Sequence, residues 1–229
     1  MGDLHGAYKA MKQCMHKAGF DYENDRLIFL GDIADSWSQV PECIEEFTRI
    51  RNLVALKGNH DVWLEQYLLN GEQPDIWLVQ GGIITVRSYE GNNFNRETHL
   101  KFLQSALPYF LDGEDRLFVH AGFNPDKPVE ETDNPPEDYY WSRDVYQRSF
   151  LAPVLPDRYR EIYIGHTPTT AVSEIPLKNH NVWLMDQGAA WKGFLSMLNL
   201  ETKEYYQSDR VTSLYPDESG RSGLKNIVT

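Results

Sequence analysis

The sequence predicts an α/β fold, in which short buried strands alternate with helices along the chain. Short apolar runs recur from residue 26 to residue 200, a pattern typical of strands inside a sheet. Between several of these runs, apolar residues recur every three or four positions, which is typical of helices that pack one face on a core. The length of 229 residues suits one large domain with a sizeable core.

Strands are predicted where a short apolar run ends at a glycine or a polar turn. These runs are residues 26–30, 53–56, 83–89, 116–120, 161–164, 182–185 and 194–200. The polar segment at residues 2–6 resembles the turns that follow the other strands, but no residues precede it to form one. We therefore expect the numbering to begin inside the natural protein, with the first strand upstream of Met1. The alternative is a fold that does without this strand.

Helices are predicted from apolar residues at helical spacing. In residues 7–18, Met11, Cys14 and Met15 lie on one face, and Gly19 suits a left-handed C-terminal cap. Pro41 suits the first turn of a second helix at residues 42–51. Two further helices are expected at residues 62–70 and 97–107, and we interpret their apolar faces as core.

Two segments are predicted to lack regular structure. Residues 124–138 are acidic and rich in proline, so they are expected to form a long loop. After residue 208 the periodicity is lost, and Pro216, Gly220 and Gly223 follow. We expect a main domain at residues 1–208 and a loosely attached tail at residues 209–229.

The net charge of the chain indicates which classes of partner are not expected to bind it. The chain has 22 Lys and Arg against 34 Asp and Glu, a net charge of −12, which disfavours a nucleic-acid polymer or a membrane surface as partner. A small anionic substrate held by a metal stays compatible with this charge. Cys14 and Cys43 fall on apolar helix faces and are predicted to be buried free thiols. Without a signal peptide or an apolar run of membrane length, we expect a cytoplasmic protein.

Four carboxylates and four imidazoles lie in five segments with glycines, at residues 2–6, 31–35, 58–61, 120–122 and 165–167. Asp3 and His5 are two positions apart, so in an extended loop both side chains can reach one cation. Asp32 follows an apolar strand, where a buried carboxylate is costly unless it is paired or binds metal. Its two oxygens can bridge two cations.

The later segments supply the remaining polar groups. The Asn59 side-chain oxygen is a neutral ligand, and His60 beside it would face a substrate and be oriented by Asp35. His120 and His166 each end a predicted strand and would complete a second metal site. Asp186 ends another strand and is expected to support the metal ligands without binding the metal itself.

The predicted ligands are oxygen and nitrogen atoms without thiolate, which suits Mn²⁺ first, and also Fe or Zn²⁺. Two such cations activate a shared water and hold the oxygens of a phosphoryl group during displacement. The sequence contains no glycine-rich phosphate loop with Lys-Ser/Thr and no Gly-x-Ser-x-Gly motif. The pattern therefore favours hydrolysis of a phosphoester by metal-activated water.

With these residues in place, the chain resembles the calcineurin-like metallophosphoesterases, in particular the small bacterial and phage branch of the serine/threonine phosphoprotein phosphatases. The resemblance runs from Gly2 to about Ala189 and includes residues 77–82, 87–89, 118–122, 141–143 and 165–168. It implies two mixed β-sheets packed face to face with helices outside, a four-layer α/β/β/α fold. The main domain would then be a metallophosphoesterase domain.

The resemblance also implies roles for the residues. The first metal would be held by Asp3, His5 and Asp32, and the second by Asp32, Asn59, His120 and His166. His60 would protonate the leaving group, with Asp35 orienting it. Arg143 matches an arginine that grips phosphate in the family, and Asn59 would also contact the substrate.

The sequence departs from the family at two places. Ser36 and Trp37 stand where the family has Arg-Gly, so one phosphate-gripping arginine is absent there. Asp61 stands where the family often has glutamate.

The leading prediction for function is a protein phosphatase acting on phosphoserine, phosphothreonine or, with dual specificity, phosphotyrosine; small phosphoesters are also expected substrates. The alternative is a dinucleoside polyphosphate hydrolase, with Trp37 stacking on a base. A third hypothesis is a catalytically inactive metal-binding scaffold.

Overall fold

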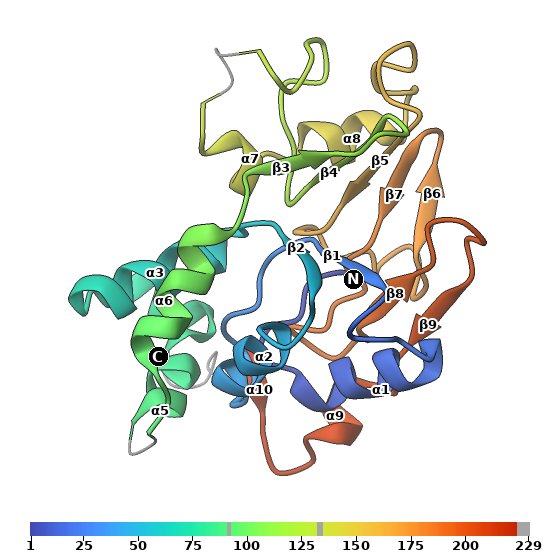
Figure 1. The fold of residues 1–229 in the computed structure, drawn as a ribbon. Coiled ribbons are helices and arrows are strands. Elements are labelled where there is room, and N and C mark those ends of the chain that lie inside the picture. The colour runs from blue at the N-terminus through green and yellow to red at the C-terminus, as the bar shows by residue number, and fades with distance from the viewer. Residues whose placement is uncertain (91–92, 132–134, 224–229) are drawn as a thin grey trace.

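The computed structural model describes residues 1–90, 93–131 and 135–223. A five-stranded mixed sheet has the order β3-β4-β5-β7-β6 (Figure 1). Its inner strands β4 (Arg116–Val119), β5 (Glu161–Ile164) and β7 (Val182–Leu184) are parallel. Its edges β3 (Tyr109–Leu111) and β6 (Leu177–Asn179) are antiparallel to their neighbours.

A second strand layer is built from two strand pairs. β1 (Arg26–Phe29) runs parallel to β2 (Asn52–Ala55), and β8 (Ser196–Leu198) runs antiparallel to β9 (Tyr205–Gln207). Residues 1 and 2 connect the pairs: the Met1 carbonyl accepts from Leu30 N at 3.0 Å, and Gly2 N donates to Ser196 O at 3.1 Å. The predicted upstream strand lies outside this sequence and stays a prediction.

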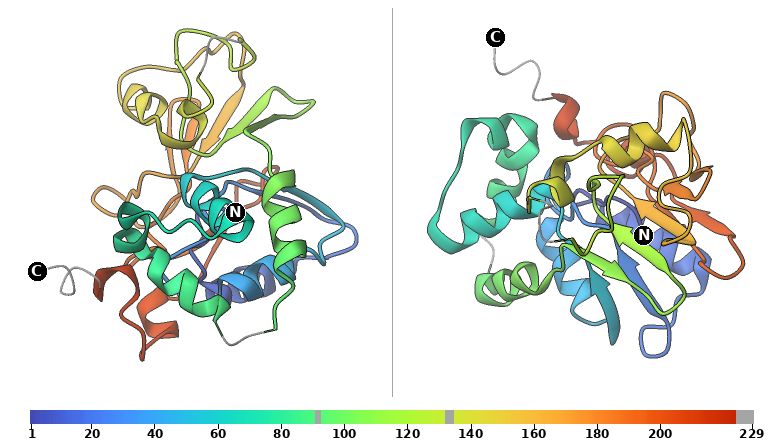
Figure 2. Two further views of the ribbon diagram at one scale, coloured as in Figure 1. Left: turned by 90° about the vertical axis from the view of Figure 1, so that its left-hand side faces the viewer. Right: turned by 90° about the horizontal axis from the view of Figure 1, so that it is seen from above.

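The two strand layers pack face to face and are covered by helices (Figure 2, left). The contact between the layers is an apolar cluster of Ile28, Leu30 and Leu56 with Phe118, Tyr163 and Met185. On the outer side of the β1–β2 layer, a larger cluster includes side chains from α1 (Tyr8–Ala18), α2 (Val40–Phe47), α3 (Asn59–Asn70) and α6 (Arg96–Ser105). On the far side of the five-stranded sheet, α7 (Asp138–Trp141) and α8 (Asp144–Ser149) contribute to a third. The predicted α/β/β/α fold is confirmed.

Most predicted elements are present with shifts at their ends, but residues 83–89 form a helix, α5 (Ile83–Tyr89), instead of a strand. α5 follows α4 (Asp75–Trp77) and the kinked helical stretch η1 (Leu78–Gly82), in which Gly81 has φ 113°. The β-branched residues of the segment favoured a strand. Thr85, Val86, Ser88 and Tyr89 are nevertheless buried, and this spacing is that of one helix face.

The C-terminal segment is packed on the domain, so the expectation of a loosely attached tail is wrong for residues 209–223. α9 (Val211–Leu214) buries Val211, and Tyr215 behind it is 2% exposed. α10 (Gly220–Gly223) lies against η1. Residues 224–229 lie outside the described residues.

The predictions for the cysteines and for the loop at residues 124–138 agree with the structure. Cys14 and Cys43 are free and buried. Outside residues 132–134, which are not described, the segment 124–138 forms neither helix nor strand until α7 begins at Asp138. In the part of the chain that the structure describes, no helix combines the length and the apolar character needed to cross a membrane.

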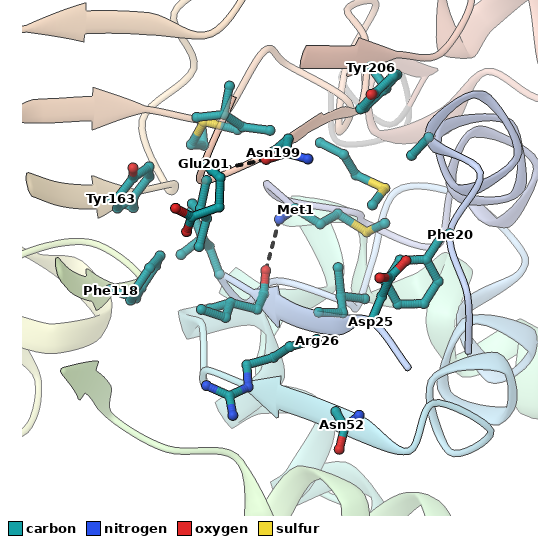
Figure 3. A pocket seen from close by; sticks show the side chains of 18 of the residues that line it. Met1, Phe20, Asp25, Arg26, Asn52, Phe118, Tyr163, Asn199, Glu201 and Tyr206 are labelled. Atoms are coloured by element: carbon teal, nitrogen blue, oxygen red, sulfur yellow. Dashed lines mark hydrogen bonds between the residues drawn. The ribbon is translucent and has the colours of Figure 1, made fainter. Parts of the chain in front are cut away.

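A pocket of about 510 Å³ opens beside Met1 (Figure 3). The Met1 ammonium donates to Ile28 O at 2.8 Å, and burial lowers its pKa to about 5. Arg26, Asn52 and Arg116 line the pocket at the amino ends of their strands. It therefore lies away from the carboxyl ends, where the polar residues gather.

Candidate metal centre

The predicted site residues converge at the carboxyl ends of the strands, as expected for an α/β sheet. The polar residues come shortly after the strands: Asp32 and Asp35 follow β1, Asn59 and His60 follow β2 as the first residues of α3, His120 follows β4 and His166 follows β5. Asp3 and His5 precede α1 and reach the same place from the connecting segment.

Backbone conformation helps to turn these side chains together. His5, Asp32, Asp35 and His166 all have positive φ values, of 50°, 59°, 77° and 63°. Such conformations are unfavourable for residues other than glycine and cluster at functional sites. The surrounding hydrogen bonds hold them: His5 N, for example, donates to Asp32 O at 2.9 Å.

The first group of close donor atoms comprises His5, Asp32 and His60, whose ligand atoms lie within 4.8 Å of one another. His5 donates from Nδ1 to Ala34 O at 2.8 Å, which leaves Nε2 free as a ligand. This Nε2 lies 3.6 Å from Asp32 Oδ2. The His60 backbone N donates to the other Asp32 oxygen at 3.0 Å.

The second group comprises Asp32, His120 and His166, again within 4.8 Å. His120 donates from Nδ1 to Leu30 O at 2.8 Å, and its Nε2 lies 3.5 Å from Asp32 Oδ2. The Asn59 Oδ1 atom belongs to the same cluster, 3.3 Å from His120 Nε2 and 3.0 Å from His166 Nδ1. Asp32 is thus shared by both groups, as a bridging ligand must be.

Asp3 lies beside these groups but belongs to neither. Its Oδ2 accepts from His166 N at 2.8 Å, while its Oδ1 is buried without a hydrogen-bond partner among the described residues. A Cβ at Gly165 would lie 2.0 Å from this Oδ1, so a glycine is required there. A buried carboxylate oxygen without a partner is costly unless a cation joins it.

His60 and Asp35 form a buried pair next to the first group. His60 Nδ1 is hydrogen-bonded to Asp35 Oδ2. The Asp35 carboxylate also accepts from Trp77 Nε1 at 2.8 Å and from the Thr85 hydroxyl at 2.7 Å. The His60 ring is therefore fixed, with Nε2 as the atom available to a substrate.

The electrostatics of the site follow from burial and from carboxylates packed together. Burial raises the pKa of Asp3 well above its usual range, and the charges of Asp186 and Asp32 add to this. Burial likewise raises the pKa of Asp186 to about 7, with Asp32 contributing. For Asp32 itself, burial would raise the pKa, but the imidazoles around it, His120 first, lower it. Burial would lower the pKa of His60, but Asp32 and Asp35 raise it.

Asp61 holds the turns of the site together, a structural role that the sequence analysis did not assign. Its carboxylate accepts from the backbone N atoms of Gly58, Asp32 and Ile33 at 2.8–2.9 Å. It therefore ties the turn after β1 to the start of α3. The signal for this role is an acidic residue at the third position of a helix that begins at a site turn.

Two residues predicted to contact the substrate, Arg143 and Trp37, differ in their exposure. Arg143 is exposed and immediately precedes α8, and its side chain forms no hydrogen bond or ion pair with the residues that the structure describes. It lies near enough to the site for its charge to help lower the pKa of His166 to about 3, after burial and the charge of His120. The expectation that Trp37 stacks on a base is wrong, because Trp37 is fully buried and donates to Ala189 O at 2.7 Å.

The residues present fit a pair of divalent cations. Two donor groups share one carboxylate, all donors are oxygen or nitrogen, and Asp3 Oδ1 is an orphaned buried oxygen. Hard and borderline cations such as Mn²⁺, Fe and Zn²⁺ suit this donor set. Trp141, which is 40% exposed, packs edge-on against Trp63 and His166 at ring distances of 5.2 and 6.1 Å, so an aromatic pair borders the site.

Comparison with known proteins agrees with this geometry. The model of the calcineurin-like phosphoesterases matches residues 1–194. Serine/threonine-protein phosphatase 1 of Salmonella typhimurium is 26% identical over 216 residues, which cover 88% of this chain and 90% of that protein. The symmetrical bis(5'-nucleosyl)-tetraphosphatase of Aromatoleum aromaticum is 31% identical over 68 residues, 28% of this chain and 24% of that protein. The solved structure of a proposed diadenosine tetraphosphatase has a TM-score of 0.66 at 13% identity, with 90% of each chain covered, a likeness of fold.

Proposed function

The chain belongs to the calcineurin-like phosphoesterase family and is a hydrolase of phosphoric esters; from this premise we propose that it is a protein phosphatase for phosphoserine and phosphothreonine. We extend the proposal to phosphotyrosine as a dual specificity. The similarity to a serine/threonine-protein phosphatase along 88% of the chain supports this substrate class.

The observation that carries the proposal is the His60–Asp35 pair beside two donor groups that share Asp32. The leaving group of phosphoserine is an alkoxide, which needs a proton as the P–O bond breaks. A positioned acid supplies this proton. A phosphate leaving group, as in a nucleotide anhydride, depends much less on it.

We assign the metal-ligand roles to Asp3, His5, Asp32, Asn59, His120 and His166, with Mn²⁺ as the favoured metal and Fe or Zn²⁺ as alternatives. Two bound cations would activate a water and screen the phosphoryl oxygens. His60 then gives its Nε2 proton to the leaving oxygen, and Asp35 stabilises the charged imidazolium and holds its orientation. Arg143 and the Asn59 amide contact the phosphoryl oxygens.

The alternative substrate, a dinucleoside polyphosphate, is supported by a different residue from the one predicted. Trp37 is buried, but Trp141 is exposed beside His166 and offers a ring face to a base. The inactive-scaffold hypothesis is disfavoured, because a scaffold has no need for the buried His60–Asp35 pair. Nucleic-acid polymers and membranes stay predicted non-partners on the basis of the net charge of −12.

A substrate panel tests the proposal. Protein of measured metal content is assayed with phosphoserine, phosphothreonine and phosphotyrosine peptides and with diadenosine tetraphosphate, in Mn²⁺, in Zn²⁺ and with chelator. We expect the highest kcat/KM on phosphoserine or phosphothreonine peptides in Mn²⁺ and loss of activity with chelator. A higher kcat/KM on diadenosine tetraphosphate than on every peptide would reject the phosphatase assignment.

A further inference from the structure

The turn after β1 provides no cation for a phosphate group. Ser36 and Trp37, which stand in place of the family's Arg-Gly, are both fully buried. The Trp37 ring stacks on Tyr215 at 5.1 Å between centroids. The indole therefore points into the core and serves as a packing surface for the C-terminal segment.

This packing positions an arginine of α10. Gly220 has φ +52°, and a Cβ on it would lie 3.0 Å from the Trp37 ring, so α10 rests directly on the indole. The next residue is Arg221. Its guanidinium donates to the Gln80 side chain of η1 and lies 4.7 Å over the ring of Trp191.

Both anchors of Arg221 lie in segments that adjoin the candidate metal centre. Gln80 precedes Gly81, whose Cβ position would be 3.2 Å from Asp35 Cβ. Trp191 lies in the turn at residues 189–192, which follows Asp186 in the sequence. The hydrogen bond and the stacking contact thus hold the guanidinium between η1 and the turn at residues 189–192, and α10 as a whole contacts η1.

The positive charge of Arg221 interacts electrostatically with the carboxylates of the site, although it forms no direct ion pair with them. Burial lowers the pKa of Arg221, and the charges of Asp35, Asp32 and Asp186 oppose this effect. Among residues 1–90, 93–131 and 135–223, no carboxylate oxygen lies within ion-pair distance of its guanidinium. A half-buried guanidinium that is held in place and lacks an ionic partner is suited to bind an anion.

We propose that Arg221 is a phosphate-binding residue that replaces the arginine missing from the turn after β1. Guanidinium N–H groups can form two parallel hydrogen bonds to phosphoryl oxygens, a geometry that serine and tryptophan cannot reproduce. Arg221 lies beyond residues 1–194, which match the family model, so this role belongs to the C-terminal segment of this chain. The inference rests on the proposed phosphoester hydrolysis and names a further residue for it.

Calorimetric titration of Mn²⁺-loaded protein with inorganic phosphate tests this role directly. Arg221→Gln keeps a polar group near Gln80 but removes the charge. Arg221→Lys keeps the charge but removes the planar guanidinium with its paired N–H donors. Arg51→Ala, at a side chain that is 71% exposed, is the control. Loss of a charge-assisted contact should weaken phosphate binding roughly 10- to 100-fold in Arg221→Gln, with a smaller loss in Arg221→Lys. Equal phosphate affinity in Arg221→Gln and wild type would overturn the proposal.

A second measurement uses wild-type protein, so it does not depend on how well a variant folds. Phenylglyoxal modifies accessible arginines, and the rate at Arg221 can be followed by mass spectrometry of the digested protein. Inorganic phosphate should slow modification at Arg221 and leave the rate at Arg51 unchanged. Equal rates at Arg221 with and without phosphate would also overturn the proposal.

Failure of this inference can be separated from failure of the proposed function. Neither titration nor protection requires turnover, so both remain informative if no phosphopeptide is hydrolysed. Conversely, an active phosphatase in which Arg221→Gln binds phosphate normally would retain the proposed function and lose only the role of Arg221.

Discussion

Replacement of His60 by asparagine tests the chemistry proposed for the site. The change removes the imidazole whose Nδ1 pairs with Asp35 and whose ring packs edge-on against His5 and Trp63 at 5.0 and 5.2 Å. Asp35 keeps its hydrogen bonds from Trp77 and Thr85. The buried carboxylate therefore does not lose all of its partners, and the variant should fold.

The expected magnitude depends on the leaving group. General acid catalysis contributes roughly 10²–10⁴-fold, which corresponds to about 3–5 kcal/mol of transition-state stabilisation. We expect a loss of kcat in this range for a phosphoserine peptide, because its alkoxide leaving group needs the proton. For an aryl phosphate the loss should be much smaller, since a phenolate leaves readily without protonation.

The assay compares wild type and His60→Asn on both substrate types, with metal content measured in parallel. His60 also lies in the first group of close donor atoms, so it could instead be a metal ligand. Under the proposed role, both proteins carry the same metal content. An equal loss on alkyl and aryl substrates, or the loss of one metal per chain in the variant, would refute the assignment of His60 as the acid.

Three further predictions concern neighbouring residues. Asp32→Asn should lower bound Mn²⁺, measured by elemental analysis, and most of the activity, because it removes the carboxylate shared by both donor groups; full metal occupancy in this variant would contradict the bridging role. Asp35→Asn removes a charge that raises the pKa of His60, so His60 should lose its proton at a lower pH in this variant. The basic limb of the kcat–pH profile should therefore move to lower pH, and an unchanged basic limb would argue against the role of the His60–Asp35 pair. Arg143→Ala should reduce kcat/KM by roughly 10²-fold if Arg143 contacts the transferring oxygens; unchanged kinetics would make it a surface residue.

The convergence of the site could be predicted because its signals are local. Asp32, His120 and His166 each follow a short apolar strand, Asp32 and His166 directly after a glycine and His120 two positions before one. The carboxyl ends of neighbouring strands meet at one edge of a layer, so residues far apart in sequence were expected to meet. The structure brings them together without any further assumption about the loops.

The partners that hold the site could not be predicted, because they depend on packing between distant segments. Thr85 donates to Asp35 only because residues 83–89 are helical, whereas their β-branched residues favour a strand when read alone. The C-terminal segment has little periodicity, and it is ordered by contacts such as the stacking of Tyr215 on Trp37. Such contacts follow from tertiary structure and leave no regular pattern in the segment itself.

Two features of the site are energetically unfavourable, the burial of several carboxylates together and the positive φ angles of its turns, and a bound metal would offset both. Asp3, Asp32 and Asp186 are buried in one place, and the raised pKa values of Asp3 and Asp186 express how unfavourable their combined negative charge is. The turns that present the ligands also contain residues at positive φ, each costing on the order of 1 kcal/mol or more. Divalent cations would neutralise the carboxylates and fix the turns, so metal affinity and local stability are linked. The apolar clusters of the four layers include residues next to the ligands, such as Leu4, Ile33 and Val119, and so provide the rigid frame that keeps this unfavourable arrangement in place.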